Sequence, residues 1–331
     1  MSTQKKATIY SVASEAGVSI ATVSRVLGTR GRVAPTTRRR VEEAAARLNY
    51  APLASARSLA SKRHAALGLV VDTTTPAQTI TSFTNHAATS SEAVMLVVAD
   101  GPHDDHQRIA RLARRVDGLA LVTEREFPAD LITELASSCP VVTVGRQPVP
   151  GVDAVLANHA DMSAQVVDHL VAHGRKHLEF VTGPRTDNAA RERYEGFSLA
   201  LLRAGLPVPH PRVPTWEASD WTIDPLSGID AVKDADGLMC ADDVLAVALM
   251  AALRQKGVTV PHDIAVVGWG DAPMSRHSWP SLSTVHPPAA EIGQVAALRL
   301  QARIQGDGPL DHPILLTHTF LPRDSCGCLT R

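Results

Sequence analysis

The stretch 7-ATIYSVASEAGVSIATVSRVL-27 decides how the first part of the chain folds. In its first half, apolar residues recur at the i, i+3, i+4 and i+7 positions of one helical face: Ile9, Val12, Ala13 and Ala16. Thr8 is placed to cap the start of this helix, and Gly17 is placed to end it. The spacing therefore predicts a short helix between these two residues.

The second half of the stretch predicts another short helix, which begins after the N-cap Ser19 and ends near Leu27. Its apolar face consists of Val23, Val26 and Leu27, and its opposite face carries Ile20, Ala21, Ser24 and Arg25. A third helix starts at Pro35, which suits the first helical position, and buries Val41, Ala44, Ala45 and Leu48. Two short helices joined by a tight turn and followed by a third are typical of a helix-turn-helix.

Charge is divided unevenly along the chain, although the formal net charge is −1 at pH 7. Residues 1–63 hold twelve Lys and Arg against three Glu, a sum of +9, and the rest of the chain sums to −10. An asymmetry of this size indicates a basic arm for a polyanion joined to an acidic body. DNA or an anionic membrane surface fits this arm, and a merely solvated basic face fits it equally well on charge alone.

A helix-turn-helix places the N-terminal end of its second helix in the major groove of DNA. This assigns Ile20, Ala21 and Arg25 to base edges, where an arginine can donate two hydrogen bonds to a guanine. Hydroxyl side chains suited to phosphate contacts are Thr8, Ser19, Thr22, Ser24, Thr37 and Tyr50. The alternative is a small helical bundle whose serines and threonines only cap helices.

From residue 66 onward, apolar runs of strand length alternate with helical stretches. One series of predicted strands is Leu67–Val71, Val94–Val98, Gly118–Val122 and Pro140–Val144, and a second series is Leu178–Thr182, Gly237–Cys240 and Ile264–Gly268. Buried runs separated by helices favour parallel sheets. Two series suggest two lobes, and a ligand is expected in the cleft at the carboxyl ends of the strands.

Other classes of protein lack support in the sequence. No run approaches the ~18 apolar residues of a membrane span, and the chain start lacks the apolar core of a signal peptide, so a cytoplasmic location is expected. The phosphate-loop, nucleophile-elbow and H-E-x-x-H motifs are absent, so neither an enzyme nor a cofactor is expected. The spacing of Cys326-Gly-Cys328 is too tight for the usual zinc motif, and no metal is expected.

The first sixty residues resemble the DNA-binding segment of the LacI/GalR family of bacterial transcription regulators. The resemblance rests on ATIYSVASEAGVSIATVSRVL, RVAPTTRRRVEEAAARLNYAP and ASARSLAS. It implies that Thr22–Arg25 lie on the recognition helix and that Ala56–Leu59 lie on a hinge helix that folds only on operator DNA. Two copies of Leu59 would then wedge into a central base step from the minor groove, with Arg57 near the backbone. The alternative is a linker whose leucines pack on the body.

The body resembles the same family, whose effector domain has the periplasmic-binding-protein fold. The matching pieces include VDGLALV, CPVVTVGR, RERYEGFSLALLRAGLP and the terminal LPRDSCGC. The resemblance implies three chain crossings between the lobes, near Ala157, Pro287 and Thr317. It also implies that Arg193, Trp221 and Asp242 face the effector, together with Asp72 and Arg146. Taken alone, Arg193 fits better a surface ion pair at a helix start, Trp221 a core residue and Asp242 a helix N-cap.

Several positions depart from the family pattern where the effector would bind. The segment from Thr75 to Gln78 lacks the usual aromatic wall, and Ala157 and Gly270 stand where aspartates are common. Either Asp271 replaces the carboxylate missing at residue 270, or the ligand lacks the hydroxyl pair that a carboxylate would bind. A carbohydrate is the expected effector, with a nucleoside or another small metabolite as the alternative.

The sequence thus predicts an α-helical helix-turn-helix DNA-binding domain plus an α/β, two-lobed, periplasmic-binding-protein-like effector domain. The expected bounds are 1–50 for the DNA-binding domain, 51–64 for the hinge and 65–331 for the effector and dimerisation domain. Within the last, lobe one spans about 65–157 and 287–316, and lobe two spans about 158–286 and 317–328. The predicted protein is a homodimeric regulator that binds a near-palindromic operator and a small-molecule effector, with no membrane partner. A cytosolic small-molecule-binding protein with the same body fold is the alternative.

Overall fold

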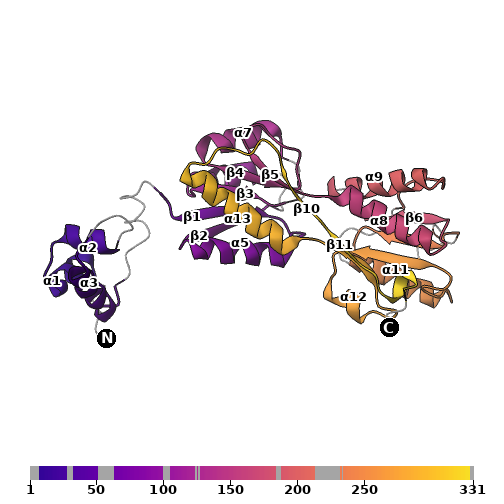
Figure 1. Ribbon diagram of the computed structural model, residues 1–331, viewed down its shortest axis with the longest axis horizontal. Coiled ribbons are helices and arrows are strands. Elements are labelled where there is room, and N and C mark those ends of the chain that lie inside the picture. Colours follow the sequence, from indigo (N-terminus) through magenta and orange to yellow (C-terminus); the bar gives the residue numbers. More distant parts are fainter. Residues whose placement is uncertain are drawn as a thin grey trace. The chain divides into compact units, whose positions relative to one another are not determined.

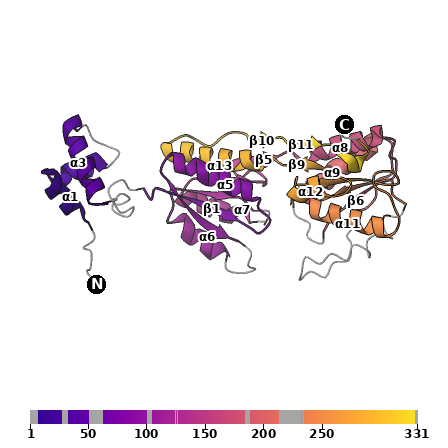
Figure 2. The same cartoon turned by 90° about the horizontal axis from the view of Figure 1, so that it is seen from below.

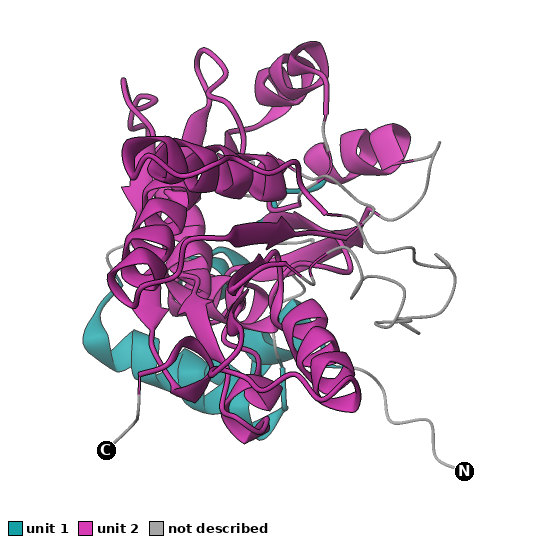
Figure 3. Cartoon of the chain, turned by 90° about the vertical axis from the view of Figure 1, so that its right-hand side faces the viewer, with its two compact units in different colours: residues 1–66, 115–117 teal, residues 67–114, 118–331 magenta. Residues whose placement is uncertain are grey.

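The computed structural model of the chain describes residues 7–27, 33–50, 63–99, 105–123, 125, 127–183, 188–212, 232 and 234–328. Its contacts divide the chain into two compact units (Figure 3). The first unit comprises residues 1–66 with 115–117, and the second comprises residues 67–114 with 118–331. Within the described ranges, no helix is both long and apolar enough to cross a membrane.

The described residues of the first unit form three helices, as the sequence predicts: α1 (Ile9–Ala16), α2 (Ile20–Leu27) and α3 (Pro35–Arg47). The Thr8 hydroxyl accepts a hydrogen bond from the Ser11 amide at 3.3 Å, and Gly17 ends α1 in the left-handed region with φ of 61°. The Ser19 hydroxyl accepts from the Thr22 amide at 3.2 Å. The predicted apolar faces meet in one small core that includes Val12, Val23, Val26, Val41 and Ala44.

A six-stranded sheet forms the centre of lobe one, in the order β10-β5-β4-β3-β1-β2. Its strands are β1 (Ala66–Val71), β2 (Ala93–Val98), β3 (Gly118–Leu121), β4 (Val141–Val144), β5 (Asp153–Ala157) and β10 (Ile314–Leu316). The registers of four of its strand pairs are parallel. Helices α5 (Ala77–Thr89) and α13 (Ala289–Gln305) cover one face, and α6 (Asp105–Ala113) and α7 (Ala129–Ser138) lie on the other (Figures 1 and 2).

A five-stranded sheet forms the centre of lobe two, in the order β11-β9-β8-β7-β6. Its strands are β6 (Leu178–Val181), β7 (Gly237–Cys240), β8 (Ala265–Trp269), β9 (Ser283–His286) and β11 (Thr319–Leu321), and only β11 runs antiparallel to its neighbour. Helices α8 (His159–Ala172) and α9 (Asn188–Arg203) pack on one face, and α11 (Asp243–Gln255) packs on the other. The short elements α12 (Pro273–His277) and η1 (Asp324–Cys326) also belong to this lobe.

The chain passes between the two sheets three times. It leaves β5 for α8 at Asn158, leaves β9 for α13 at Pro287 and Pro288, and leaves β10 for β11 at Thr317 and His318. Each passage lies at or next to a residue where the family resemblance implies a crossing, namely Ala157, Pro287 and Thr317. Each lobe is therefore built from segments that are distant in the sequence.

Two features of the sheets differ from the sequence prediction. The sequence predicts a buried strand at Val94–Val98, but β2 is an edge strand on which Met95, Leu96 and Val98 are exposed. Four strands were not predicted: β5, β9, β10 and β11. The buried Asp153 interrupts the apolar pattern of β5, and its charge is met by Arg299 at 2.9 Å.

Close helix contacts depend on one glycine in each lobe. A Cβ atom on Gly293 of α13 would lie 2.1 Å from the Thr79 carbonyl oxygen of α5. A Cβ atom on Gly196 of α9 would lie 2.1 Å from the Ala160 carbonyl oxygen of α8. Both contacts are with backbone atoms, which cannot rotate away, so a larger residue would push the two helices apart.

We expect Gly293→Ala to lower the free energy of unfolding by about 1–3 kcal/mol, because overpacking costs more than the ~1 kcal/mol that alanine gains in helix propensity. Urea denaturation of the two proteins measures this difference. Gly308→Ala is the matched control, since nothing lies within 4 Å of its Cβ position and a change within about 0.5 kcal/mol is expected there. Equal stability of wild type and Gly293→Ala would show that α5 and α13 can separate without cost.

Candidate functional site

The outward face of α2 carries the side chains that the sequence assigns to base edges. Ile20, Ala21, Ser24 and Arg25 are all exposed, and the Ile20 side chain is 41% exposed although it is large and apolar. Arg25 forms no hydrogen bond or ion pair with another described residue. The face is thus available for an external partner, with one cation and two apolar side chains in the first two turns of the helix.

Other arginines of the first unit hold its helices together. The Arg40 guanidinium donates to the Ala16 carbonyl at 2.7 Å, at the C-terminal end of α1. Arg38 donates to the Val26 carbonyl at 3.4 Å, and Arg47 pairs with Glu15 at 3.1 Å. The net charge of this segment predicts a polyanion partner. A charge count cannot reveal that some of these arginines also donate hydrogen bonds to the carbonyls at helix ends. Arg25 differs from them in having no such role in the described structure.

Most of the predicted phosphate-binding hydroxyls have structural roles as well. Thr8 caps α1, and the Ser19 and Thr22 hydroxyls lie 2.9 Å apart at the start of α2. Thr37 is partly buried, and Tyr50 packs against the core of the unit. Capping therefore accounts for Thr8 and Ser19, while the N-terminal ends of α1 and α2 keep the positive dipole that binds phosphate. Arg57 and Leu59 lie outside the described residues.

A cavity of about 230 Å³ lies at the carboxyl ends of β4 and β5. Residues from both lobes line it: Gly145, Arg146, Gln147, Leu156, Ala157, Asn158, His159, Ala189, Glu192 and Leu315. Burial, together with the charge of Glu195, raises the pKa of Glu192. Of the predicted effector residues that the structure describes, only Arg146 lines this cavity, and Arg193 follows the lining residue Glu192.

Three aromatic rings form a cluster beside the cavity. His159 starts α8, Trp269 ends β8, and His318 lies on the third passage between the sheets. The ring centroids of His159 and His318 are 4.6 Å apart, and those of Trp269 and His318 are 4.9 Å apart. The Arg193 guanidinium lies over the Trp269 ring, 4.5 Å from its centroid, and donates to the Ala241 carbonyl at 2.7 Å. A guanidinium can stack on an aromatic face and donate hydrogen bonds from its edge at the same time.

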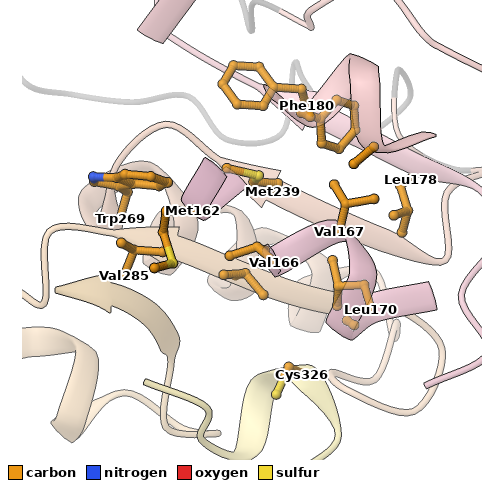
Figure 4. Packing of buried hydrophobic residues seen from close by; sticks show 14 of the residues in the cluster. Met162, Val166, Val167, Leu170, Leu178, Phe180, Met239, Trp269, Val285 and Cys326 are labelled. Atoms are coloured by element: carbon orange, nitrogen blue, oxygen red, sulfur yellow. The ribbon is translucent and has the colours of Figure 1, made fainter. Parts of the chain in front are cut away.

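The two histidines of this cluster are neutral near pH 7. Burial, with the charge of Arg193, lowers the pKa of His159 to about 2 and that of His318 to about 4. A neutral imidazole has one N–H donor and one acceptor nitrogen. Among the described residues, His159 Nδ1 and Trp269 Nε1 are buried without a hydrogen-bond partner, and the indole nitrogen points away from the labelled core side chains (Figure 4). A polar ligand would satisfy such groups.

Comparisons with known proteins agree with this arrangement of parts. The sequence profile of bacterial regulatory proteins of the lacI family matches residues 8–52, and that of the periplasmic binding protein-like domain matches residues 167–326. The transcriptional repressor PurR of Aliivibrio fischeri is 30% identical over 315 residues, which are 90% of this chain and 92% of the relative. The chain belongs to the LacI/GalR family of bacterial transcription regulators.

Further relatives match nearly the whole length of this chain. The ribose operon repressor of Escherichia coli is 29% identical over 336 residues, which cover 96% of this chain and 99% of the relative. A crystal structure of the Lac repressor dimer bound to operator and an anti-inducer aligns with a TM-score of 0.84 at 26% identity, covering 97% of this chain and 99% of that one. The protein is accordingly a DNA-binding transcription regulator with an effector domain.

Two predicted effector residues of this LacI-family chain have partners that fix their orientation. The Arg146 guanidinium donates to the Thr123 carbonyl at 2.7 Å and to the Arg125 carbonyl, and it lies over the Phe127 ring. Asp242 caps α11, since its Oδ1 accepts from the Leu245 amide at 2.7 Å. The sequence left this capping role open as an alternative, and the structure shows it. Trp221 lies outside the described residues.

Asp72 and Asp271 do not line the cavity. The Asp72 carboxylate is buried and accepts from the hydroxyls of Thr74 at 2.7 Å and Thr123 at 2.6 Å. Asp271 accepts from Arg276 at 3.2 Å and also from Arg323. Burial acts to raise the pKa of Asp271, but these hydrogen bonds outweigh it and hold the pKa below its ordinary value. Both carboxylates therefore satisfy groups of their own lobe.

Asp243 is a buried carboxylate that the sequence prediction missed. It accepts from the Ala272 amide and the Ser275 hydroxyl, each at 2.7 Å, and from the Thr284 hydroxyl at 2.5 Å. It thereby joins the start of α11 to α12 and β9. A Cβ atom at Gly270 would lie 3.6 Å from this carboxylate, so an aspartate at residue 270 would place a second negative charge beside it.

Proposed function

We propose that the protein is a homodimeric repressor that acts in the cytoplasm, binds a near-palindromic operator and changes its operator affinity when a carbohydrate binds between its two lobes. The observation that carries the DNA-binding part is the outward face of α2, where Arg25 has no partner among the described residues. In this proposal, Arg25 donates to a guanine, and Ile20 and Ala21 make apolar contacts, for instance with a thymine methyl group.

The hinge segment completes the proposed DNA contact. Arg57 and Leu59 lie outside the described residues, and their roles rest on the family resemblance. Two copies of Leu59 would open a central base step from the minor groove, which bends the operator toward the major groove. Such a segment can remain unfolded until it docks on DNA, because a short helix with few apolar residues is marginal in water.

The proposed effector site combines the cavity with the aromatic cluster beside it. Arg193 and Arg146 supply guanidinium donors, and His159 and Trp269 supply polar atoms without a partner among the described residues. A carbohydrate matches this mixture, because its hydroxyls both donate and accept and its ring faces pack on aromatic side chains. A relative named for the ribose operon supports a sugar. Asp242 would accept a hydroxyl hydrogen bond, and Trp221 would add a second aromatic face.

A ligand in the cavity would contact both lobes and the segments that join them. The cavity includes residues at the first passage between the sheets, Ala157 and Asn158, and His318 lies on the third. A ligand that prefers one relative angle of the lobes would shift the population toward it and change the spacing of the two hinges in a dimer. Operator affinity would change by the same coupling free energy.

The exposed edge of lobe one supports the homodimer. Met95, Leu96 and Val98 of β2 are 36%, 47% and 37% exposed, on a strand that ends the sheet. An apolar edge strand of this kind invites pairing with another chain unless it is covered. A second copy would cover it with the same surface around a twofold axis, which also matches the symmetry of a near-palindromic operator.

We expect Ala21→Gln to change the base preference within each operator half-site, because glutamine can form two hydrogen bonds with an adenine where alanine offers only a methyl group. Selection of binding sites from random duplex DNA measures this. Operator affinity of both proteins should also fall by about tenfold or more between 50 and 200 mM salt, as release of counterions from phosphates requires.

Ala46→Gln is the control for this substitution, since Ala46 is an exposed residue on α3 rather than on the outward face of α2. It should select the parental operator. The placement of α2 in the major groove would be wrong if Ala21→Gln also selected the parental sequence, and a flat salt dependence would leave the basic segment without its proposed role.

A thermal-shift screen of sugars and nucleosides against the full chain tests the effector site. We expect a sugar to raise the unfolding temperature and to change operator affinity, and Arg193→Met to weaken the sugar by about tenfold or more, because a charged hydrogen bond would be lost. Arg203→Met is the matched control, since Arg203 is exposed at the end of the same helix. A nucleoside as the only hit would replace the carbohydrate, and a hit unaffected by Arg193→Met would place the effector elsewhere.

We expect Leu96→Glu to dissociate the dimer, because two buried carboxylates would face each other across the twofold axis. Light scattering coupled to gel filtration gives the mass in solution. Leu199→Glu is the control, since Leu199 is 59% exposed on α9 and should leave the mass unchanged. A dimer that survives Leu96→Glu would show that β2 is not the interface.

A further inference from the structure

Four side chains with sulfur or nitrogen ligand atoms meet at one end of lobe two, and none of them lines the cavity. His169 and His173 lie one turn apart near the end of α8, Cys326 ends η1, and Cys328 follows two residues later. One potential ligand atom each from His169, Cys326 and Cys328 lies within 4.8 Å of the others. No part of the proposed regulatory function uses these residues.

The separations of these atoms are those of ligands around one small ion. His169 Nε2 lies 3.3 Å from Cys326 Sγ and 3.6 Å from Cys328 Sγ, and His173 Nε2 lies 3.4 Å from Cys328 Sγ. Tetrahedral zinc, with bonds of about 2.3 Å to sulfur and about 2.0 Å to nitrogen, separates such atoms by about 3.5 Å. The three measured distances therefore match the edges of a zinc tetrahedron.

Local structure brings the two thiols to the same side. Gly327 takes the left-handed conformation with φ of 98°, which turns the chain between Cys326 and Cys328. The Cys326 amide donates to the Ser283 hydroxyl of β9 at 3.2 Å, and the Cys326 side chain is fully buried at the edge of the core (Figure 4). The His169 ring packs edge-on against Phe320 of β11, with centroids 4.8 Å apart. Three of the four groups are thus held, and the exposed His173 can turn to complete the set.

We propose that His169, His173, Cys326 and Cys328 form a zinc site that joins α8 to the C-terminal segment of the chain. Two thiolates and two imidazoles in tetrahedral arrangement select zinc over magnesium or calcium, which prefer oxygen ligands. Because protein side chains supply all four positions, the site is structural and leaves no position for a substrate. It connects residues 155 or more positions apart in the sequence, and its binding free energy therefore stabilises folded lobe two.

The sequence alone argues against this site because of the spacing of its cysteines, but the fold supplies the other two ligands from a distant helix. A Cys-Gly-Cys pair is too tight for a zinc motif formed with neighbouring residues. Here the other two ligands come from a helix far upstream, spaced i and i+4 so that both imidazoles lie on one face. Only the packing of α8 against η1 and β11 shows that the two pairs meet.

Zinc retention by the full chain, prepared without a histidine tag and in a reductant, tests the proposal. The protein is stripped with a chelator, incubated with zinc and dialysed, and its zinc is then measured by mass spectrometry. We expect about one zinc ion per chain in the wild type, and retention at least about tenfold lower in Cys326→Ser and Cys328→Ser. His173→Ala should weaken zinc binding without unfolding the protein, because His173 is exposed.

Cys139→Ser is the matched control, since Cys139 is a free, buried cysteine of lobe one. It should retain zinc as the wild type does, and a chelator should lower the unfolding temperature of both. Cobalt in place of zinc should give the charge-transfer absorption of a thiolate complex, and Cys328→Ser should weaken it. The proposal is overturned if the reduced wild type retains no zinc, or if His173→Ala and both cysteine variants retain it undiminished. A Cys326–Cys328 disulfide in a chain that binds no zinc when reduced would replace the metal site with a redox pair.

Discussion

The effector domain depends on one constraint: its chain passes between two sheets three times, and the passages leave the strands at one end of each sheet. Parallel strands present their carboxyl ends along a single edge, so the segments that connect the lobes share that edge with any ligand. Asn158 on the first passage lines the cavity, and His318 on the third lies against Trp269 at the end of β8. Two groups of the proposed effector site, His159 and His318, therefore lie on or next to the segments that join the lobes.

Local signals in the sequence were sufficient to predict the helix-turn-helix. Thr8, Gly17, Ser19 and Pro35 mark helix ends by chemistry that acts within a few residues, and the structure confirms each boundary to within a residue. Strands β1, β3, β4, β6, β7 and β8 were predicted for a similar reason, because a buried strand is a short apolar run, whereas the parallel strands β5, β9 and β10 were missed. The buried Asp153 shows the limit of this rule, since a charged residue with a distant partner, Arg299, breaks the pattern of β5.

The candidate sites were less predictable, because they are assembled from distant segments. His159, Trp269 and His318 come from three elements of the fold, and none of them carries a local signal for ligand binding. The family resemblance identified Arg193, which lies over Trp269, but it also suggested Asp271, whose carboxylate is held by Arg323 and Arg276. A motif match gives the position of a residue in a fold, whereas its hydrogen-bond partners decide whether it is available to a ligand.

Charge shows the same distinction within the first unit. The net charge of +9 predicts a polyanion partner, yet Arg38, Arg40 and Arg47 also satisfy carbonyls or carboxylates of the helices themselves. An arginine committed to a helix end has fewer donors for DNA, and its loss would destabilise the unit as well as weaken binding. Loss of the Arg25 side chain would weaken DNA binding without a matching loss of stability, since Arg25 forms no hydrogen bond or ion pair with a described residue.

Helix α8 connects the proposed effector cavity to the proposed zinc site. Its first residue, His159, lines the cavity, His169 lies in its last turn, and His173 is its C-cap. A helix transmits a displacement along its axis because its backbone hydrogen bonds are continuous, and the packing of α8 on α9 leaves it little room to bend. If an effector prefers one position of α8 and zinc prefers the same one, each ligand must tighten the binding of the other by the same factor. The effector cavity and the zinc site, which bind different ligands, would then be coupled through α8. The strength of that coupling would depend on how far the position of α8 differs between the two states of the regulator.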